Sequence, residues 1–480
     1  MSSISKISLK HSLLQLQCHF TWNLRREDVD LDDLEETVGD QIKFFIESNS
    51  KNYNLLSYVH HLKNANEEAL RSLKKAEEIV ERNHPDEIAR RSLVTWGNYA
   101  WIYYYMERYE EAQSYVSKVV NSCKKLSSTA QWTIQLPEID AEKGWAFLKF
   151  GGIYYKRAKD CFEDALKGDP NNPEFNAGYA IAMYRLENYF HRECEDASLS
   201  FKPLKRAVEL NPGDTSIVAL FALKLQDLNQ ADEGERYIEE AMQKTPDLPY
   251  FLRYAAKFYR RRGDTDKALE IVKKALSVTP NSAFLHHQLA LCYRAKLFQL
   301  KKSTRYPPQD QVEELIQRAI FHFKKVTDKR PKLYVAHTDL AKMYAEAKRY
   351  EEAKAAFQKA FQINNMPDSD KQQCYYYYGN FQRFQMKSES EAIQCYIEAL
   401  KIENDSYLFH KCRTTLKKLL EQRIQGGSRN ATDFGTLGFI HNLNGEKHEA
   451  IECYEKAVEL CPNNEEYLSA LCELQLSVSR

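Results

Sequence analysis

Glycine and proline are scarce in this chain, with 16 glycines and 14 prolines among 480 residues. Collagen-like, low-complexity and turn-rich architectures need more of both, so the composition favours long helices. Hydrophobic residues make up 43% and charged residues 28%, as expected of a globular protein in water. A chain of this length exceeds a single ordinary core, which predicts several domains or a repeat array.

Long apolar runs are also absent. The sequence has no run of about 18 apolar residues, so we expect no membrane span. Its first residues, MSSISKISLKHSLLQLQ, lack the apolar block and cleavage site of a secretory signal. Eleven cysteines without a C-x-x-C pair favour a reducing compartment over a disulfide framework. Together these features predict a soluble cytoplasmic protein.

Sequence signatures of catalysis are missing. There is no P-loop, no dinucleotide-binding glycine motif, no H-E-x-x-H and no G-x-S-x-G. The histidine pairs His60–His61 and His286–His287 are adjacent, and neighbours on a helix point about 100° apart, so neither pair can chelate one metal. We therefore expect a protein that is not an enzyme.

Charge is balanced overall but unevenly distributed. The chain has 68 basic and 68 acidic residues, yet residues 250–305 hold 13 Lys and Arg against 3 Asp and Glu. Residues 27–40 show the opposite bias, with eight acids and no base. A strongly basic stretch in a neutral protein indicates a site for an anion.

A repeat period decides the predicted architecture. Two residue types recur at a spacing of 34 positions: Pro212, Pro246 and Pro280, and Ala207, Ala241 and Ala275. This is the tetratricopeptide period, in which each helix–turn–helix unit buries its apolar face by stacking on the next. Roughly ten units can be aligned. We predict an all-α tetratricopeptide-repeat superhelix in which extra helices close a central basic pocket.

The irregular segments suggest four parts. Residues 1–50 are predicted to form N-terminal helices that cover the pocket. Repeats then follow in an N-terminal subdomain (51–245), a central one (246–365) and a C-terminal one (366–480) that ends in a capping helix. Insertions at residues 187–200 and 301–311 are expected to separate the helices of two repeats.

The stretch from Tyr250 to Arg262 has two faces. An apolar stripe at helical spacing is expected to pack on neighbouring helices, while a second stripe contains Tyr250, Arg253, Tyr254 and Lys257. Aromatic rings interleaved with cations suit a single-stranded nucleic acid, whose bases stack and whose phosphates need charge. Arg261 and Arg262 could equally belong to a solvated helix end.

Lys149 occupies an unusual position. Four other repeats place a tyrosine at the equivalent site: Tyr103, Tyr259, Tyr293 and Tyr344. A lysine there would be desolvated unless an anion compensated its charge. It could instead reach solvent along its stem, or pair with Glu142. Arg253, and Arg185 just past the first helix of the next repeat, strengthen the interpretation that Lys149 faces an anion.

Several segments closely resemble the interferon-induced proteins with tetratricopeptide repeats. They are CHFTWNL (18–24), RSLVTWGNYAW (91–101), EKGWAFLKFGG (142–152), RYAAKFYRR (253–261) and FLHHQLALCYRA (284–295). The likeness runs essentially end to end and includes the insertions. NPEFNAGYAI (172–181) and EYLSALCELQLS (466–477) are most similar to the branch numbered five.

The resemblance implies an innate immune, antiviral protein that holds single-stranded RNA by its 5′ end in a basic tunnel. The phosphate-pocket positions of the family match Thr37, Gln41, Lys149, Tyr155, Arg185, Tyr250, Arg253, Tyr254 and Gln288. Positions along the RNA path match Arg260, His287, Lys302 and Lys411, and Phe284 shares a helix face with His287. Family aromatics are replaced by Leu333 and Val335, which puts base stacking there in doubt.

A carboxylate that the family uses to hold Mg²⁺ with the phosphates matches Asp33, one carbon shorter. The expected cofactor is therefore none, or Mg²⁺ bound with the RNA.

We expect a protein that sequesters RNA carrying a 5′-triphosphate, without sequence specificity and without catalysis. Related repeat proteins are possible further partners. Two alternatives stay open at this point. One is a preference for capped RNA lacking 2′-O-methylation, and the other is a peptide-binding adaptor, the commonest use of this repeat.

Overall fold

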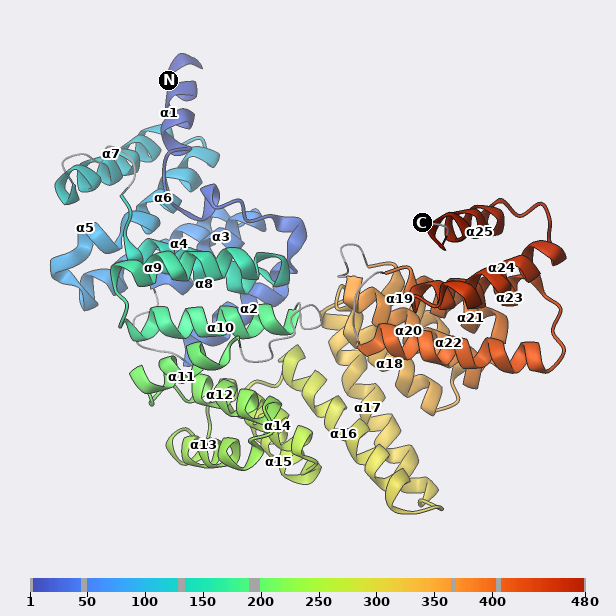
Figure 1. The fold of residues 1–480 in the computed structure, drawn as a ribbon. Coiled ribbons are helices and arrows are strands. Elements are labelled where there is room, and N and C mark those ends of the chain that lie inside the picture. The colour runs from blue at the N-terminus through green and yellow to red at the C-terminus, as the bar shows by residue number, and fades with distance from the viewer. Residues whose placement is uncertain are drawn as a thin grey trace. The chain divides into compact units, whose positions relative to one another are not determined.

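The computed structural model describes residues 3–44, 50–127, 134–189, 199–363, 366, 368–402 and 407–478. These residues form 25 α-helices and four short 3-10 helices, with no strand among them (Figure 1). The predicted all-α class is confirmed. Among the described helices, none is both long and apolar enough to cross a bilayer.

The chain divides into two compact units. The first comprises residues 1–299 with 328–330, and the second residues 300–327 with 331–480. This division crosses the predicted central segment 246–365, and the four predicted parts stay a prediction.

The first unit contains α1 Ser3–Leu13, α2 Leu31–Phe44, α3 Ser50–Leu62, α4 Asn66–Asn83, α5 Ile88–Arg91, α6 Leu93–Tyr105, α7 Tyr109–Leu126, α8 Pro137–Phe150, α9 Tyr155–Gly168, α10 Pro173–Tyr189, α11 Phe201–Leu210, α12 Thr215–Asp227, α13 Ala231–Lys244, α14 Pro249–Arg262, α15 Thr265–Val278 and most of α16 Ala283–Ser303. Its 3-10 helices are His19–Thr21, Arg26–Asp28, Pro85–Glu87 and Gly152–Tyr154. The second unit contains α17 Gln309–Lys329, α18 Tyr334–Glu346, α19 Tyr350–Phe361, α20 Asp368–Phe384, α21 Glu389–Leu400, α22 Tyr407–Gln425, α23 Ala431–Leu443, α24 Lys447–Leu460 and α25 Glu465–Val478.

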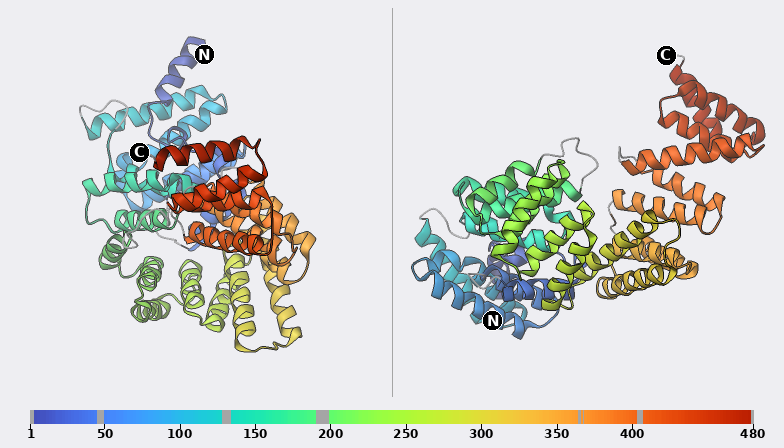
Figure 2. Two further views of the ribbon diagram at one scale, coloured as in Figure 1. Left: turned by 45° about the vertical axis from the view of Figure 1, so that its right-hand side comes forward. Right: turned by 90° about the horizontal axis from the view of Figure 1, so that it is seen from below.

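Within each unit, successive helices pack as hairpins that stack on one another (Figure 2). The period-34 alanines Ala207, Ala241 and Ala275 are all buried, because the paired helices approach closely at these positions. Asp214 and Asp264 cap two of the helices by accepting hydrogen bonds from backbone N–H groups of the first turn. The 34-residue period in the sequence therefore corresponds to helix pairs in the structure.

Two glycines bring α8, α9 and α10 close together around one ring. A Cβ on Gly178 of α10 would lie 2.2 Å from the Phe162 ring, and one on Gly144 of α8 would lie 2.8 Å from it. No larger residue fits at either position without displacing Phe162, which is fully buried in α9. The close packing places Lys149 on α8, Tyr155 on α9 and Arg185 on α10 near one another.

The insertions and the N-terminal segment differ in part from the expectation. Residues 301–311 do not separate two helices by a long loop. Helix α16 runs to Ser303, because no glycine or proline interrupts the insertion before Pro307, and α17 begins at Gln309, directly after the two prolines. The other insertion lies largely outside the described residues, although α10 continues to Tyr189. In the N-terminal segment, α1 packs on α6 and α7, whereas α2 packs on α3. The final helix, α25, packs on α24, as expected of a cap.

Candidate functional site

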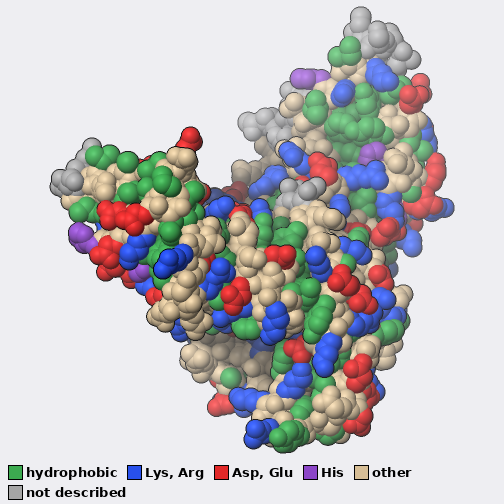
Figure 3. Space-filling view, turned by 90° about the vertical axis from the view of Figure 1, so that its right-hand side faces the viewer, with side chains coloured by type: hydrophobic (Ala, Val, Ile, Leu, Met, Phe, Trp, Pro, Cys, Tyr) green, Lys and Arg blue, Asp and Glu red, His purple; other side chains and the backbone are tan. Residues whose placement is uncertain are grey.

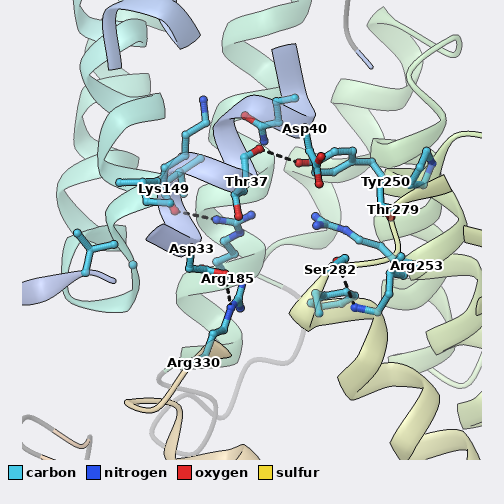
Figure 4. Close-up of a pocket in the computed structure, with 18 of the residues that line it drawn as sticks. Asp33, Thr37, Asp40, Lys149, Arg185, Tyr250, Arg253, Thr279, Ser282 and Arg330 are labelled. Atoms are coloured by element: carbon cyan, nitrogen blue, oxygen red, sulfur yellow. Dashed lines mark hydrogen bonds and ion pairs between the residues drawn. The ribbon is translucent and has the colours of Figure 1, made fainter. Parts of the chain in front are cut away.

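A cavity of about 390 Å³ lies within the first unit (Figure 4). Its walls come from α2, α8, α9, α10, α14 and the beginning of α16, helices that are up to about 250 residues apart in sequence. Eight of the nine predicted phosphate-pocket residues line it: Thr37, Gln41, Lys149, Tyr155, Arg185, Tyr250, Arg253 and Tyr254. Asp33 and Phe284 line it as well. Lys149 and Arg253 therefore line one cavity.

Lys149 is desolvated at the end of α8. Burial, together with the nearby charges of Lys51 and Arg185, lowers the pKa of Lys149 to about 7. Its ammonium donates a hydrogen bond to Asn52 Oδ1. Glu142 acts on Lys149 through its charge, but its carboxylate accepts a hydrogen bond from Asn54 Nδ2 at 2.9 Å, and burial raises its pKa to about 7. The environment of Lys149 thus favours an added negative charge.

Arg185 lies inside α10, four residues before its end, so the prediction that it follows a helix is wrong. Its Nη1 donates to the backbone carbonyl of Leu148 at 2.8 Å, and its guanidinium lies 5.7 Å from the centre of the Tyr155 ring. Burial acts to lower the pKa of Arg185, but Tyr155 and Tyr254 outweigh it and raise the pKa. Arg185 is thus a fixed cation in the wall opposite α14.

Arg253 is surrounded by aromatic rings. Its guanidinium lies 4.6 Å from the ring centre of Tyr250, 4.4 Å from that of Tyr254 and 5.0 Å from that of Phe284. Its Nη2 donates to the Tyr254 hydroxyl at 2.6 Å, while its Nε is buried without a hydrogen-bond partner. A buried, unpaired N–H on a cation is a donor available to an anionic ligand.

The Tyr254 hydroxyl shows the effect of the nearby cations, whereas the Tyr250 hydroxyl shows mainly the effect of burial. Burial acts to raise the pKa of Tyr254, but Arg253 and Arg185 outweigh it, so the pKa is lowered. Tyr250 has its pKa raised to about 12, chiefly by burial, and its hydroxyl donates to the backbone carbonyl of Thr37 at 3.2 Å. That bond connects α14 to α2, which explains how an acidic helix comes to cover a basic cavity.

The acids of the cavity are Asp33 and Asp40. Arg330 Nε donates to Asp33 Oδ1 at 2.5 Å, and burial raises the pKa of Asp33 despite this partner. Burial and the nearby Glu36 raise the pKa of Asp40. On the face shown in Figure 3, Lys and Arg side chains are interspersed with Asp and Glu.

Magnesium has limited support from this arrangement. No cluster of three His, Cys, Asp or Glu side chains that could hold a metal occurs in the part of the chain that the structure describes. Asp33, the predicted Mg²⁺ ligand, is paired with Arg330, and a Mg²⁺ ion would take most of its ligands from water and phosphates, as this ion usually does. The proposed Mg²⁺ contact of Asp33 stays a prediction.

The remaining predicted residues lie elsewhere. Gln288 is buried in α16 and does not line the cavity. Arg260 and His287 are half-buried in α14 and α16. Lys302 and Lys411 are exposed and belong to the second unit, where the Lys411 ammonium lies 5.5 Å from the ring centres of Tyr376 and Tyr407.

Arg261 and Arg262 form a solvated helix end. Arg261 pairs with Asp227 at 2.9 Å, and Arg262 pairs with Asp232 at the same distance.

Sequence reasoning missed Arg330, Asn52 and Lys51. Arg330 contacts Asp33 across 297 residues of sequence, and Asn52 contacts Lys149 across 97. No local pattern marks either pair. Lys51 could have been noticed as a cation in the first turn of a helix, where the positive end of the helix dipole disfavours it.

A second cavity, of about 420 Å³, adjoins the first and shares six lining residues with it: Gln41, Lys149, Arg185, Tyr250, Arg253 and Tyr254. Apolar side chains form part of its wall, among them Trp145, Ile181, Ile217 and Leu220. Lys51, Asn52, Glu174, Asp214 and Ser216 supply polar groups. Its volume and mixed lining are those of a small-molecule site.

The fold and the two cavities define a tetratricopeptide-repeat protein with a cavity lined by Lys149, Arg185 and Arg253. The tetratricopeptide-repeat family model matches residues 93–125, 334–365 and 434–464. The chain is 47% identical over 462 residues to the human antiviral innate immune response effector IFIT1, covering 95% of this chain and 97% of that protein. It is 42% identical to human interferon-induced protein with tetratricopeptide repeats 2, covering 96% and 97%. This chain therefore belongs to the family of interferon-induced proteins with tetratricopeptide repeats.

Solved structures agree with this assignment. A monomeric IFIT1 mutant with Gppp-AAAA matches with a TM-score of 0.90 at 46% identity, covering 95% of this chain and all of that chain. The human IFIT1 dimer with PPP-AAAA matches with a TM-score of 0.86 at 47% identity, covering 94% and 99%. The family and the superhelix are confirmed, whereas the branch numbered five stays a prediction.

Proposed function

We propose that this protein binds single-stranded RNA through a 5′-triphosphate and sequesters it, as an antiviral effector without catalysis. The observation that carries the proposal is the convergence of Lys149, Arg185 and Arg253 in one cavity of about 390 Å³. The related human protein IFIT1 is named as an antiviral innate immune response effector, and a structure of human IFIT1 contains PPP-AAAA.

The proposed mechanism is electrostatic and sequence-independent. Arg253 and Arg185 supply guanidinium groups, which bind phosphate oxygens through charge-assisted hydrogen bonds. Lys149 adds an ammonium that an incoming anion would keep protonated. Thr37 and Gln41 of α2 supply a hydroxyl and an amide from the opposite wall. Contacts to phosphates fix position without reading bases, so we expect no sequence preference.

The second cavity favours one alternative, a capped 5′ end. It opens beside the phosphate-pocket residues and offers an indole and aliphatic side chains to a ring. A human IFIT1 dimer has been solved with m7Gppp-AAAA, at 47% identity to this chain with a TM-score of 0.88.

We also propose that this protein is located in the cytoplasm and that a related repeat protein is one of its partners.

Competition among three forms of one oligonucleotide tests the proposal. Triphosphate RNA is expected to displace a labelled triphosphate probe more strongly than monophosphate or capped RNA. The logarithm of the affinity should fall linearly with the logarithm of salt concentration, by about 0.7 per neutralised phosphate. Salt-independent binding, or equal competition by RNA without 5′ phosphates, would contradict it. Stronger competition by the capped form would favour the alternative.

Binding should also depend on pH through Lys149. Because its pKa is about 7 in the free protein, the amine is largely neutral above that pH and must take up a proton to bind phosphate. We expect the affinity for triphosphate RNA to fall by up to about tenfold per pH unit above pH 7, until the raised pKa of the complex is passed. Titration calorimetry in two buffers of different ionisation enthalpy measures this proton uptake.

Lys149→Met supplies the comparison for that measurement. This variant should bind more weakly, and its proton uptake should be smaller than that of the natural protein by the share that Lys149 contributes. Identical uptake by the two proteins would show that Lys149 does not change protonation on binding.

A further inference from the structure

Arg330 brings a further cation to the first cavity. It follows α17 directly, and its side chain lines the same space as Lys149, Arg185 and Arg253. Its Nε donates to Asp33 Oδ1 of α2 at 2.5 Å, a contact drawn as a dashed line in Figure 4. A guanidinium has N–H donors on each of its nitrogens. The bond through Nε therefore leaves the terminal Nη groups for another acceptor.

Two ion pairs hold the segment that carries Arg330 against α2. The neighbouring Lys329 pairs with Glu36 and donates to the backbone carbonyl of Asn281 at 2.7 Å. The side chains of Arg330 and Asp33 are 27% and 21% exposed, so their pair is largely shielded from solvent. The guanidinium is thus oriented before a ligand arrives, and little side-chain entropy is lost when it binds one.

We propose that Arg330 is a phosphate ligand of the first cavity, and that its guanidinium, not a divalent cation, neutralises the triphosphate beside Asp33. This assignment rests on the proposed function, because it concerns how the same site holds the same 5′ group. Neither the repeat pattern nor the family resemblance indicated this residue.

The charge of Asp33 makes such a cation necessary. A bare carboxylate in the cavity wall would repel phosphate oxygens unless a positive group lay between them. Arg330 supplies that group: its Nε binds Asp33, and its terminal N–H groups can bind a phosphate oxygen through charge-assisted hydrogen bonds. The guanidinium and the carboxylate together thus offer donors to an anion.

A metal ion at Asp33 would first have to displace Arg330 from the carboxylate. No group of three His, Cys, Asp or Glu side chains offers a metal another site in the segments that the structure describes. The predicted Mg²⁺ contact of Asp33 and the proposed role of Arg330 therefore exclude one another, and measurements of RNA binding can separate them.

Arg330→Gln tests the assignment by titration of a labelled 5′-triphosphate oligonucleotide at fixed pH and ionic strength. Glutamine keeps a donor for Asp33 but removes the charge, so the affinity should fall about tenfold or more. Arg71→Gln removes an equal charge from α4, where Arg71 is 70% exposed and pairs with Glu68. That control should stay within about twofold of the natural protein. Equal binding by Arg330→Gln and the natural protein overturns the proposal.

Asp33→Asn distinguishes the guanidinium from a metal. Asparagine keeps an oxygen that can accept from Arg330 Nε, while it removes a negative charge that repels the phosphates. The affinity for triphosphate RNA should therefore equal or exceed that of the natural protein. If Asp33 held a metal ion, the same change would weaken binding, so a loss beyond about tenfold in this variant contradicts the role of Arg330. Unfolding midpoints establish that each variant folds. If Arg330→Gln is unstable, Arg330→Gln/Asp33→Asn replaces it and should bind about tenfold more weakly than Asp33→Asn alone.

Removal of divalent cations completes the test. The natural protein, titrated in excess chelator and again in MgCl₂ at equal ionic strength, should show affinities within about threefold of one another. A loss of about tenfold or more in chelator would assign the neutralising charge to a metal and overturn the proposal. If the natural protein binds no triphosphate RNA under either condition, the proposed function fails instead, whatever the variants do.

Discussion

Replacing Arg253 by alanine is expected to weaken binding of a 5′-triphosphate oligonucleotide about a hundredfold, because a buried charge partner of the phosphates is lost. The guanidinium is held by three aromatic rings and by the Tyr254 hydroxyl, so it is ordered before the ligand arrives. Little conformational entropy is then lost on binding. The measurement is a titration of labelled RNA at fixed salt and pH.

The same helix supplies the control. Arg262 also lies on α14, but it faces solvent and pairs with Asp232 and Glu235. Arg262→Ala should leave RNA affinity within about twofold, since surface ion pairs contribute little. Arg253→Lys should be intermediate, because an ammonium keeps the charge but not the planar donor pair. If the Arg253 and Arg262 variants bind equally well, Arg253 is not part of the phosphate site.

Most of the fold could be predicted from local patterns. The 34-residue recurrence of alanine and proline predicted the helix pairs, because small residues and helix ends act within one repeat. The behaviour of the insertion at residues 301–311 could not be predicted. Its polar residues are typical of a loop. Its first residues, Lys301 and Lys302, nevertheless extend α16 to Ser303, because no helix-breaking residue precedes Pro307.

The site could be predicted in part. Lys149 stood out because it replaces a tyrosine of other repeats, and burial indeed lowers its pKa. Arg253 stood out as a cation among aromatic residues. Thr37 and Gln41 came only from the family resemblance, since nothing in an acidic helix indicates that its neighbour in space is α14. Contacts such as Arg330 with Asp33 depend on the superhelix, which no local pattern encodes.

Replacing Lys224 by alanine is expected to destabilise the first unit by about 3–5 kcal/mol, the usual cost of leaving one member of a buried ion pair unpaired. The Lys224 side chain in α12 is 1% exposed and that of Glu187 in α10 is 3% exposed. Glu187 also accepts a hydrogen bond from the backbone N–H of Ser200 at 3.1 Å. Chemical denaturation, followed by a signal from this unit, measures the loss.

A matched surface pair calibrates the effect. Lys296 pairs with Asp266, and these side chains are 41% and 78% exposed. Lys296→Ala should cost less than about 1 kcal/mol, because solvent screens such pairs. A similar cost for Lys224→Ala would mean that the Lys224 pair contributes little to stability.

The double variant Lys224→Met/Glu187→Gln removes the ion pair without leaving an unpaired carboxylate in the core. It should be more stable than Lys224→Met alone, because the glutamine keeps an acceptor for Ser200 without leaving a bare carboxylate buried. Glu187 lies two residues after Arg185 on α10, so the pair also fixes the helix that presents this cation to the phosphate pocket. We therefore expect Lys224→Met to lose RNA affinity as well as stability, and the double variant to recover both. Additive effects on stability would show that the two side chains do not interact.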